Sequence, residues 1–111
     1  MISPESKSQY IQQVTNAKVD LNSTNLTTIY TAPSGDEFDF AIIESILVCD
    51  HDNQQTNVDL SITSGSNVFH IFKEHNITAH ATDELLTRDL VLKAGEILKA
   101  QANHTNLNIV V

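Results

Sequence analysis

Histidine side chains are the groups in this sequence best suited to bind a metal or to transfer protons. There are five of them: His51, His70, His75, His80 and His104. Zinc sites use recognisable spacings such as HExxH, HxH or paired cysteines, and none of the five follows one. His70 falls inside a strand pattern, and the others lie beside loop-forming residues. The spacing therefore predicts separate surface or edge roles and no metal site, with a zinc site assembled across loops as the alternative.

A second candidate is the segment DHDNQQ, residues Asp50 to Gln55, which begins like a calcium-binding loop. Oxygen-bearing side chains stand at its alternate positions, as calcium requires. The calcium loop also needs glycine at its sixth position and an acid at its twelfth, where this chain has Gln55 and Ser61. We interpret the segment as a connection between two strands.

Catalytic arrangements have little support. Two of Asp36, Glu37 and Asp50 could form a carboxylate pair for glycoside hydrolysis, but the chain has no Trp and few aromatic rings to stack on a sugar. No GxSxG motif marks a nucleophile, and three glycines in all exclude a P-loop or a Rossmann turn. Cys49 follows Leu47 and Val48, which predicts a buried thiol. We expect no catalytic residue, no cofactor and no enzymatic activity.

Charge and composition narrow the class of partner. The chain of 111 residues has 14 acidic and 6 basic side chains, a net charge of -8. Nucleic acids and anionic membranes are disfavoured, because phosphate binding needs clustered Lys and Arg. We expect the acids to form a solvated face, with a basic partner surface as the alternative. No segment has the composition of a membrane span or a signal peptide, which predicts synthesis as a soluble protein in a reducing cytoplasm.

The elements that must position these side chains are strands, because the strongest periodicity is two. Apolar residues alternate with polar ones in three segments, which predicts three half-buried strands with these inward sets: Val58, Leu60 and Ile62; Leu98, Ala100 and Ala102; Leu107, Ile109 and Val111. In the stretch before Cys49, Phe38, Phe40 and Ile42 share one face, which we assign to the core because Glu37 and Asp39 then point outward, whereas Ile43 breaks the alternation. A bulge there, or a bend where the strand changes partners, would resolve that conflict.

Turn residues divide the chain into further strands. The segment Ala32–Gly35 matches a type I turn, with proline at its second position. Ser64–Asn67 predicts a hairpin turn, and Gly95 stands between two apolar runs where a tight turn needs positive φ. The predicted fold is therefore all-β: a two-sheet β-sandwich of jelly-roll type with about eight strands over residues 16–111.

Residues 1–15 form a separate region, predicted to be an N-terminal arm or a short helix. The region is polar, with a sparse apolar stripe of Tyr10, Ile11 and Val14. An extended arm can cover a surface on a neighbouring molecule that a compact domain does not reach. These three residues are the candidates for attachment or oligomerisation.

Two segments resemble a known group of proteins. TTIYTAPSG, Thr27 to Gly35, followed by FAIIESILVCD, is similar to the opening of small β-sandwich virion proteins of tailed bacteriophages, in which a Tyr-Thr-x-Pro-x-Gly turn precedes a long strand. ELLTRDLVLKAGEILKAQA, Glu84 to Ala102, is similar to their second characteristic hairpin. With VDLSI, these segments cover most of residues 27–111.

The resemblance implies a non-enzymatic structural protein of the virion, made in the host cytoplasm. The most concrete expectation is a capsid decoration or cement protein. Its partners would be other virion proteins, namely the major capsid protein or tail components, with a homotrimer as one arrangement. A tail or tail-fibre-associated module, with glycan binding as one role, is the alternative. A cupin-like metalloenzyme ranks last, because the two-histidine strand motif of that fold is missing.

Overall fold

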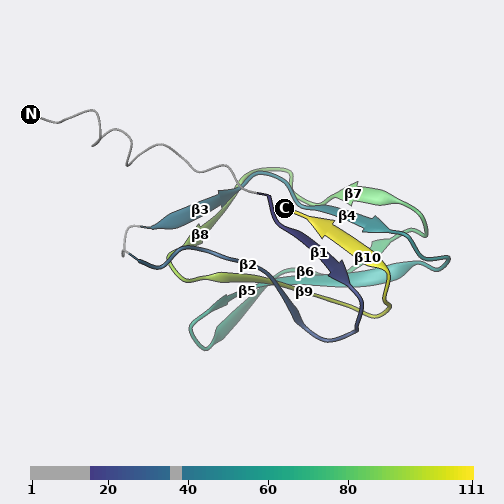
Figure 1. Ribbon diagram of the computed structural model, residues 1–111, viewed down its shortest axis with the longest axis horizontal. Helices are drawn as coiled ribbons and strands as arrows, with labels where there is room; N and C mark the ends of the chain where they lie inside the picture. Colours follow the sequence, from purple (N-terminus) through teal and green to yellow (C-terminus); the bar gives the residue numbers. More distant parts are fainter. Residues whose placement is uncertain (1–15, 36–38) are drawn as a thin grey trace, which may run out of the picture.

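The computed structural model describes residues 16–35 and 39–111. This part of the chain is all-β, with ten strands and no helix (Figure 1). The strands are β1 (Lys18–Leu21), β2 (Thr27–Thr31), β3 (Phe40–Ile43), β4 (Leu47–Asp50), β5 (Thr56–Ser64), β6 (Asn67–Ile77), β7 (Thr82–Glu84), β8 (Leu90–Lys93), β9 (Ile97–Ala102) and β10 (Leu107–Val110). The predicted arm over residues 1–15, with Tyr10, Ile11 and Val14, lies outside the described residues.

The strands form three antiparallel sheets. One four-stranded sheet has the order β1-β10-β4-β7, the second has the order β2-β9-β5-β6, and β3 pairs with β8 alone. Figure 1 shows the two larger sheets lying over each other in a sandwich-like arrangement. Most connections therefore cross from one sheet to the other, and each sheet covers the apolar face of its partner.

The two-stranded ribbon of β3 and β8 continues the pairing of β4 with β7 beyond the main sheet. The β3–β8 register ends with Ile43 opposite Leu90, and the β4–β7 register begins with Leu47 opposite Glu84. Two short connections interrupt the ladder between these pairs, so the segment from Phe40 to Asp50 is two strands in two sheets. The predicted change of partners is therefore present, but β3 itself alternates regularly through Ile43 and contains no break in alternation.

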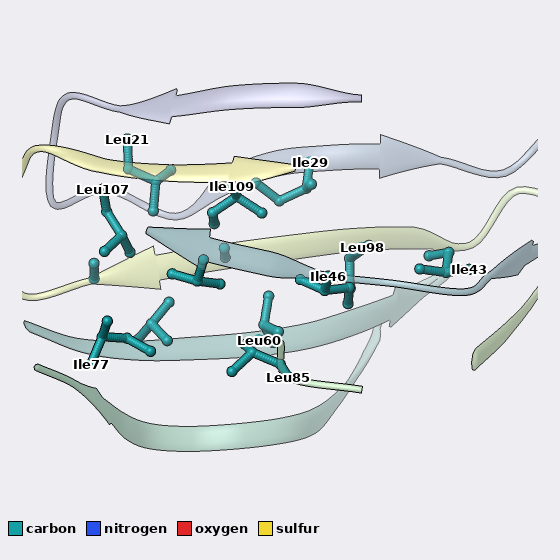
Figure 2. Close-up of a cluster of buried hydrophobic side chains, with 14 of the residues drawn as sticks. Leu21, Ile29, Ile43, Ile46, Leu60, Ile77, Leu85, Leu98, Leu107 and Ile109 are labelled. Carbon is teal, nitrogen blue, oxygen red and sulfur yellow. The ribbon is translucent and has the colours of Figure 1, made fainter. Parts of the chain in front are cut away.

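The core lies between the two larger sheets (Figure 2). Every predicted inward residue of β9 is buried, as are Leu107 and Ile109 of β10 and Val58 and Leu60 of β5. Val111, which was also predicted to face inward, lies just after β10 and is only half-buried. Ile62 is half-buried as well, because the register between β5 and β6 shifts between Leu60 and Ser61 and leaves Ser61 buried. The period-two predictions are thus confirmed except at Val111 and at the end of β5, where a bulge shifts the alternation.

Two burial predictions were wrong. Phe40 and Ile42 were assigned to the inner face of their strand, but both are exposed, and Ile43 is buried instead. Cys49 was predicted to be buried and is half-buried, because Val48 and Asp50 occupy the inward positions of β4. In β3 the alternation was recognised correctly and the covered face was not, whereas in β4 an apolar run concealed the alternation.

Turn positions agree with the sequence at two of three places. β5 and β6 are joined by the two-residue loop Gly65–Ser66, in which Gly65 has a φ of 61°, and Gly95 has a φ of 76° in the turn between β8 and β9. The Ala32–Gly35 segment was predicted as a type I turn. Its first two residues instead continue the pairing of β2 with β9, through Ala32 N–H to Glu96 O (2.9 Å) and Gly95 N–H to Pro33 O (3.2 Å).

Candidate functional site

Exposed apolar side chains gather at one end of the sandwich, where both sheets continue as two-stranded ribbons. We call this region the apolar end and define it by Phe40, Ile42, Val68, Phe69 and Val91. Figure 1 shows the β3–β8 ribbon and the tip of the β5–β6 hairpin together at the left of the molecule. Each of these side chains is at least 42% exposed. An apolar concentration of this kind marks an interaction surface in a soluble protein.

The β3–β8 ribbon is apolar on both faces. Its inner face is covered, because Ile43 of β3 and Leu92 of β8 are buried in the core. On the outer face Ile42 stands opposite Val91, and Phe40 stands opposite Lys93. Three of these four outward positions are therefore apolar, whereas the outer face of a sheet next to water is ordinarily polar.

The tip of the β5–β6 hairpin provides the other part of the apolar end. Phe69 stands opposite Ile62 and Val68 stands opposite Thr63. Phe69 is 57% exposed and Val68 is 50% exposed, although neighbouring residues of a strand point to opposite faces. Both faces of the tip are therefore open, and β6 is an edge strand whose outer backbone groups pair with no other strand of the described residues.

The opposite end of the sandwich is mostly polar, although Leu26 is an exposed leucine there. It consists of four loops, which we call the polar end: residues 22–26, 51–55, 78–81 and 103–106. His80 Nε2 lies 3.0 Å from Asn53 Oδ1, and His51 Nε2 lies 3.9 Å from Asp20 Oδ1. Within residues 16–35 and 39–111, no three His, Cys, Asp or Glu side chains are grouped as metal ligands. The structure therefore does not bring the histidines together.

One histidine joins the two sheets at their open side. His75 of β6 lies with Nε2 at 3.8 Å from Asp83 Oδ2 of β7, and its ring packs edge-to-face against Phe72 with centroids 5.2 Å apart. β6 and β7 are the edge strands of their sheets. The pair therefore links the sheets where no strand closes the sandwich, which is a structural role.

The segment that begins like a calcium loop connects β4 to β5, and a buried carboxylate at its start stabilises its turn. Asp50 is completely buried at the end of β4, and its Oδ1 accepts a hydrogen bond of 2.9 Å from Asp52 N–H. Asp50 Oδ2 and Thr56 Oγ1, at the two ends of the connection, are buried without a partner among the described residues. The Asp50 carboxylate thus organises a turn. The proposed catalytic partners Asp36 and Glu37 lie outside the described residues.

Glu84 connects the main sheet to the β3–β8 ribbon. Its carboxylate accepts hydrogen bonds from Ile46 N–H at 2.8 Å, from Leu86 N–H at 3.1 Å and from the Ser45 hydroxyl. Burial acts to raise the pKa of Glu84, but these hydrogen bonds, of which the one from Ser45 is the strongest, outweigh it and hold the pKa below its usual value. The carboxylate positions the ribbon that carries the apolar end.

Sequence reasoning missed the apolar end. Phe40 and Ile42 were assigned to the core, and no role was assigned to Val68 and Phe69. A usable signal was present at the hairpin tip, because two adjacent large apolar residues immediately after a tight turn cannot both face the same core.

Comparison with known proteins returned no matching family model, curated protein or solved structure. In the part of the chain that the structure describes, no helix is long and apolar enough to cross a membrane.

Proposed function

We propose that this chain is a non-enzymatic structural protein of a bacteriophage virion, and specifically a decoration or cement protein bound to the outside of the head. The observation that carries the proposal is the separation of an apolar end from a polar end along one molecule. A surface protein needs a face that binds the particle and a face that meets water. The apolar end supplies the first and the polar loops supply the second.

The strand order supports a jelly-roll interpretation of the fold. β3 with β4, and β7 with β8, are two interrupted strands, which leaves eight strands in the orders 1-8-3-6 and 2-7-4-5. Only the fourth and fifth strands are joined within one sheet, and every other connection crosses between sheets. This order favours a jelly roll, an architecture used by viral capsid proteins, lectins and cupins.

The partner on the head is the major capsid protein, and the localisation is the virion. An acidic protein with few bases does not bind packaged nucleic acid, so attachment is a protein contact. A tail or tail-fibre-associated module is the alternative position. The cupin-like metalloenzyme is the weakest reading, because the described residues contain no group of metal-ligating side chains.

Immunogold labelling of virions from the phage that encodes this chain tests the proposal. Label on the head supports decoration, label on the tail or fibres supports the alternative, and virions without label overturn a structural role. A second measurement is the amount of added protein that sediments with particles lacking it. Phe69→Ser and Val91→Ser should each reduce this amount at least several-fold. Leu26→Ser, which changes an equally exposed leucine in the β1–β2 loop, should leave it unchanged.

The N-terminal residues are tested separately. The sequence predicts that residues 1–15, through Tyr10, Ile11 and Val14, assist attachment or association into a homotrimer. Deletion of these residues should weaken sedimentation with particles and leave the melting temperature of the monomer nearly unchanged. If the truncated chain binds particles as well as the full chain, attachment depends on the apolar end alone.

A further inference from the structure

A shallow depression of about 350 Å³ lies on the outer face of the β2-β9-β5-β6 sheet, close to the polar end. Its walls come from the β1–β2 loop, β5, β6, β9 and the start of the β9–β10 loop. The polar side chains that line it are Thr24, Asn57, Asp59, Glu74, Gln101 and Asn103. The depression is separate from the apolar end and plays no part in the attachment proposed above.

The amide side chains in this depression are held in place by the protein itself. Asn103 Oδ1 accepts a hydrogen bond of 2.9 Å from Asn57 N–H, and Asn57 Oδ1 accepts one of 3.2 Å from the amide of Asn76. Gln101 donates through Nε2 to the carbonyl oxygen of Thr24 at 3.1 Å. Among the described residues no partner takes up Asn57 Nδ2, Asn103 Nδ2 or Gln101 Oε1. Two oriented donors and one oriented acceptor thus remain for a ligand.

The carboxylates beside these amides are also ordered. Asp59 accepts from Glu74 N–H at 2.6 Å and lies 3.3 Å from Lys73 Nζ. Glu74 has a φ of 55°, a conformation that side-chain-bearing residues rarely adopt, and its carboxylate has no partner in the described part of the chain. Strained backbone of this kind is concentrated at binding sites, where the surrounding structure maintains it.

We propose that this depression binds a neutral saccharide. The hydroxyl groups of a sugar ring both donate and accept hydrogen bonds, and the amides and carboxylates of the depression can do both with them. Because hydrogen bonds within the protein already fix these side chains, binding costs little additional side-chain entropy. The depression is at the small end of ligand sites, which suits one or two sugar rings. Asp59 and Glu74, in a chain of net charge -8, disfavour acidic sugars.

The affinity should be low, because no aromatic ring lines the depression to stack on a sugar. A few net hydrogen bonds correspond to a dissociation constant on the order of 1 mM. Many copies of the protein on one particle surface would raise the overall affinity of the particle for a sugar-bearing surface, because the copies can bind neighbouring sugars at once. The site therefore suits a repeated surface protein better than a free monomer.

Titration of the full-length, isotope-labelled protein with four free sugars, followed by amide chemical shifts, tests the proposal. The probes are glucose, galactose, mannose and N-acetylglucosamine, with glucuronate as the charged comparison. At least one neutral sugar should shift the amides around Asn57, Glu74 and Gln101 in a saturable way. Glucuronate should bind more weakly than glucose. The absence of saturable shifts at the depression with all four sugars overturns the proposal.

Two residues two positions apart on the same outer face of β9 provide a matched pair of variants. Gln101→Ala removes a lining amide and should weaken the best sugar at least five-fold, whereas Lys99→Ala, outside the depression, should leave its affinity unchanged. Glu74→Gln removes the negative charge and should narrow the difference between glucose and glucuronate. Equal affinity in the Gln101 and Lys99 variants would place the binding elsewhere. Neither variant touches the apolar end, so these results are independent of particle attachment.

Discussion

Asp59 of β5 accepts a hydrogen bond of 2.6 Å at Oδ1 from the backbone N–H of Glu74 in the adjacent strand β6. The pairing of β5 with β6 gains a residue here, so that Asp59 faces both Lys73 and Glu74. The carboxylate thereby satisfies an amide that the interrupted ladder leaves without a strand partner, and it holds Glu74 at its positive φ of 55°. A single outward aspartate stabilises the bulge.

Glycine substitutions at two adjacent residues of this bulge should change the free energy of unfolding in opposite directions. Glu74→Gly relieves a side-chain clash in the left-handed conformation and loses no side-chain hydrogen bond, so it should raise the free energy of unfolding by about 1 kcal/mol. Lys73→Gly places glycine at negative φ and removes the contact with Asp59, so it should lower that energy by about 1 kcal/mol. Urea denaturation measures both. A decrease in both variants would show that Glu74 is unstrained.

The register of β5 predicts unequal costs for two apolar truncations. Leu60 is completely buried, so Leu60→Ala should lower the free energy of unfolding by about 2 to 5 kcal/mol. Ile62 is half-buried beyond the bulge, so Ile62→Ala should cost less than half as much. Chemical denaturation compares the two. A cost for Leu60→Ala below about 0.5 kcal/mol, the range of surface substitutions, is incompatible with this register.

The alternation of apolar and polar residues predicted which side chains of a strand share a face. Whether those side chains are buried depends on which elements cover that face. In β9 the more apolar set, Leu98 with its alanines, is the covered set, and the prediction was right. In β3 the larger side chains, Phe40 and Ile42, point away from the core, and Ile43 is the buried residue. The β3–β8 part of the apolar end was unpredictable for that reason: both faces of β3 carry apolar residues, and the sequence does not say which of them the core covers.

The depression near the polar end was hidden from sequence for a different reason. Asn57, Glu74 and Gln101 are each unremarkable outward residues of separate strands, and only the register brings them together. The bulge at Glu74 contains no glycine or proline from which the sequence could have predicted it. The turn at Gly65, which glycine marks, was predicted correctly.

Thr56 offers a test of an unsatisfied polar group in the core. Its hydroxyl is completely buried and has no partner among the described residues. Thr56→Val keeps the shape and removes the unpaired hydroxyl, so it should raise the free energy of unfolding by about 1 kcal/mol. Thr28→Val, at an exposed position of β2, should change it by less than about 0.5 kcal/mol. Destabilisation by Thr56→Val would show that the hydroxyl has a hydrogen-bond partner in solution.

Glu84 should make stability depend on acid pH. Hydrogen bonds from Ser45, Ile46 and Leu86 hold its folded-state pKa below 4.5, its ordinary value. A depressed pKa means that the ionised carboxylate stabilises the fold. That contribution is fully present above the ordinary pKa and is lost as the pH falls through the lowered one. The carboxylate is largely exposed, so solvent screening limits the effect.

Glu84→Gln isolates this contribution, because the amide keeps one acceptor but no charge. The variant should be less stable than the wild-type chain at about pH 7, by no more than roughly 1 kcal/mol, and the difference should shrink below about pH 4.5. Glu44→Gln is the matched control, because Glu44 lies in the β3–β4 connection that Glu84 binds and has no hydrogen bond or ion pair in the described part of the chain. Urea denaturation across this pH range measures both. If the difference between Glu84→Gln and wild type stays constant down to about pH 3, the carboxylate does not hold the ribbon through its charge, and the junction between β3 and β4 depends instead on the packing of Ile46 and on the hydrogen bond from Leu85 N–H to Ile46 O.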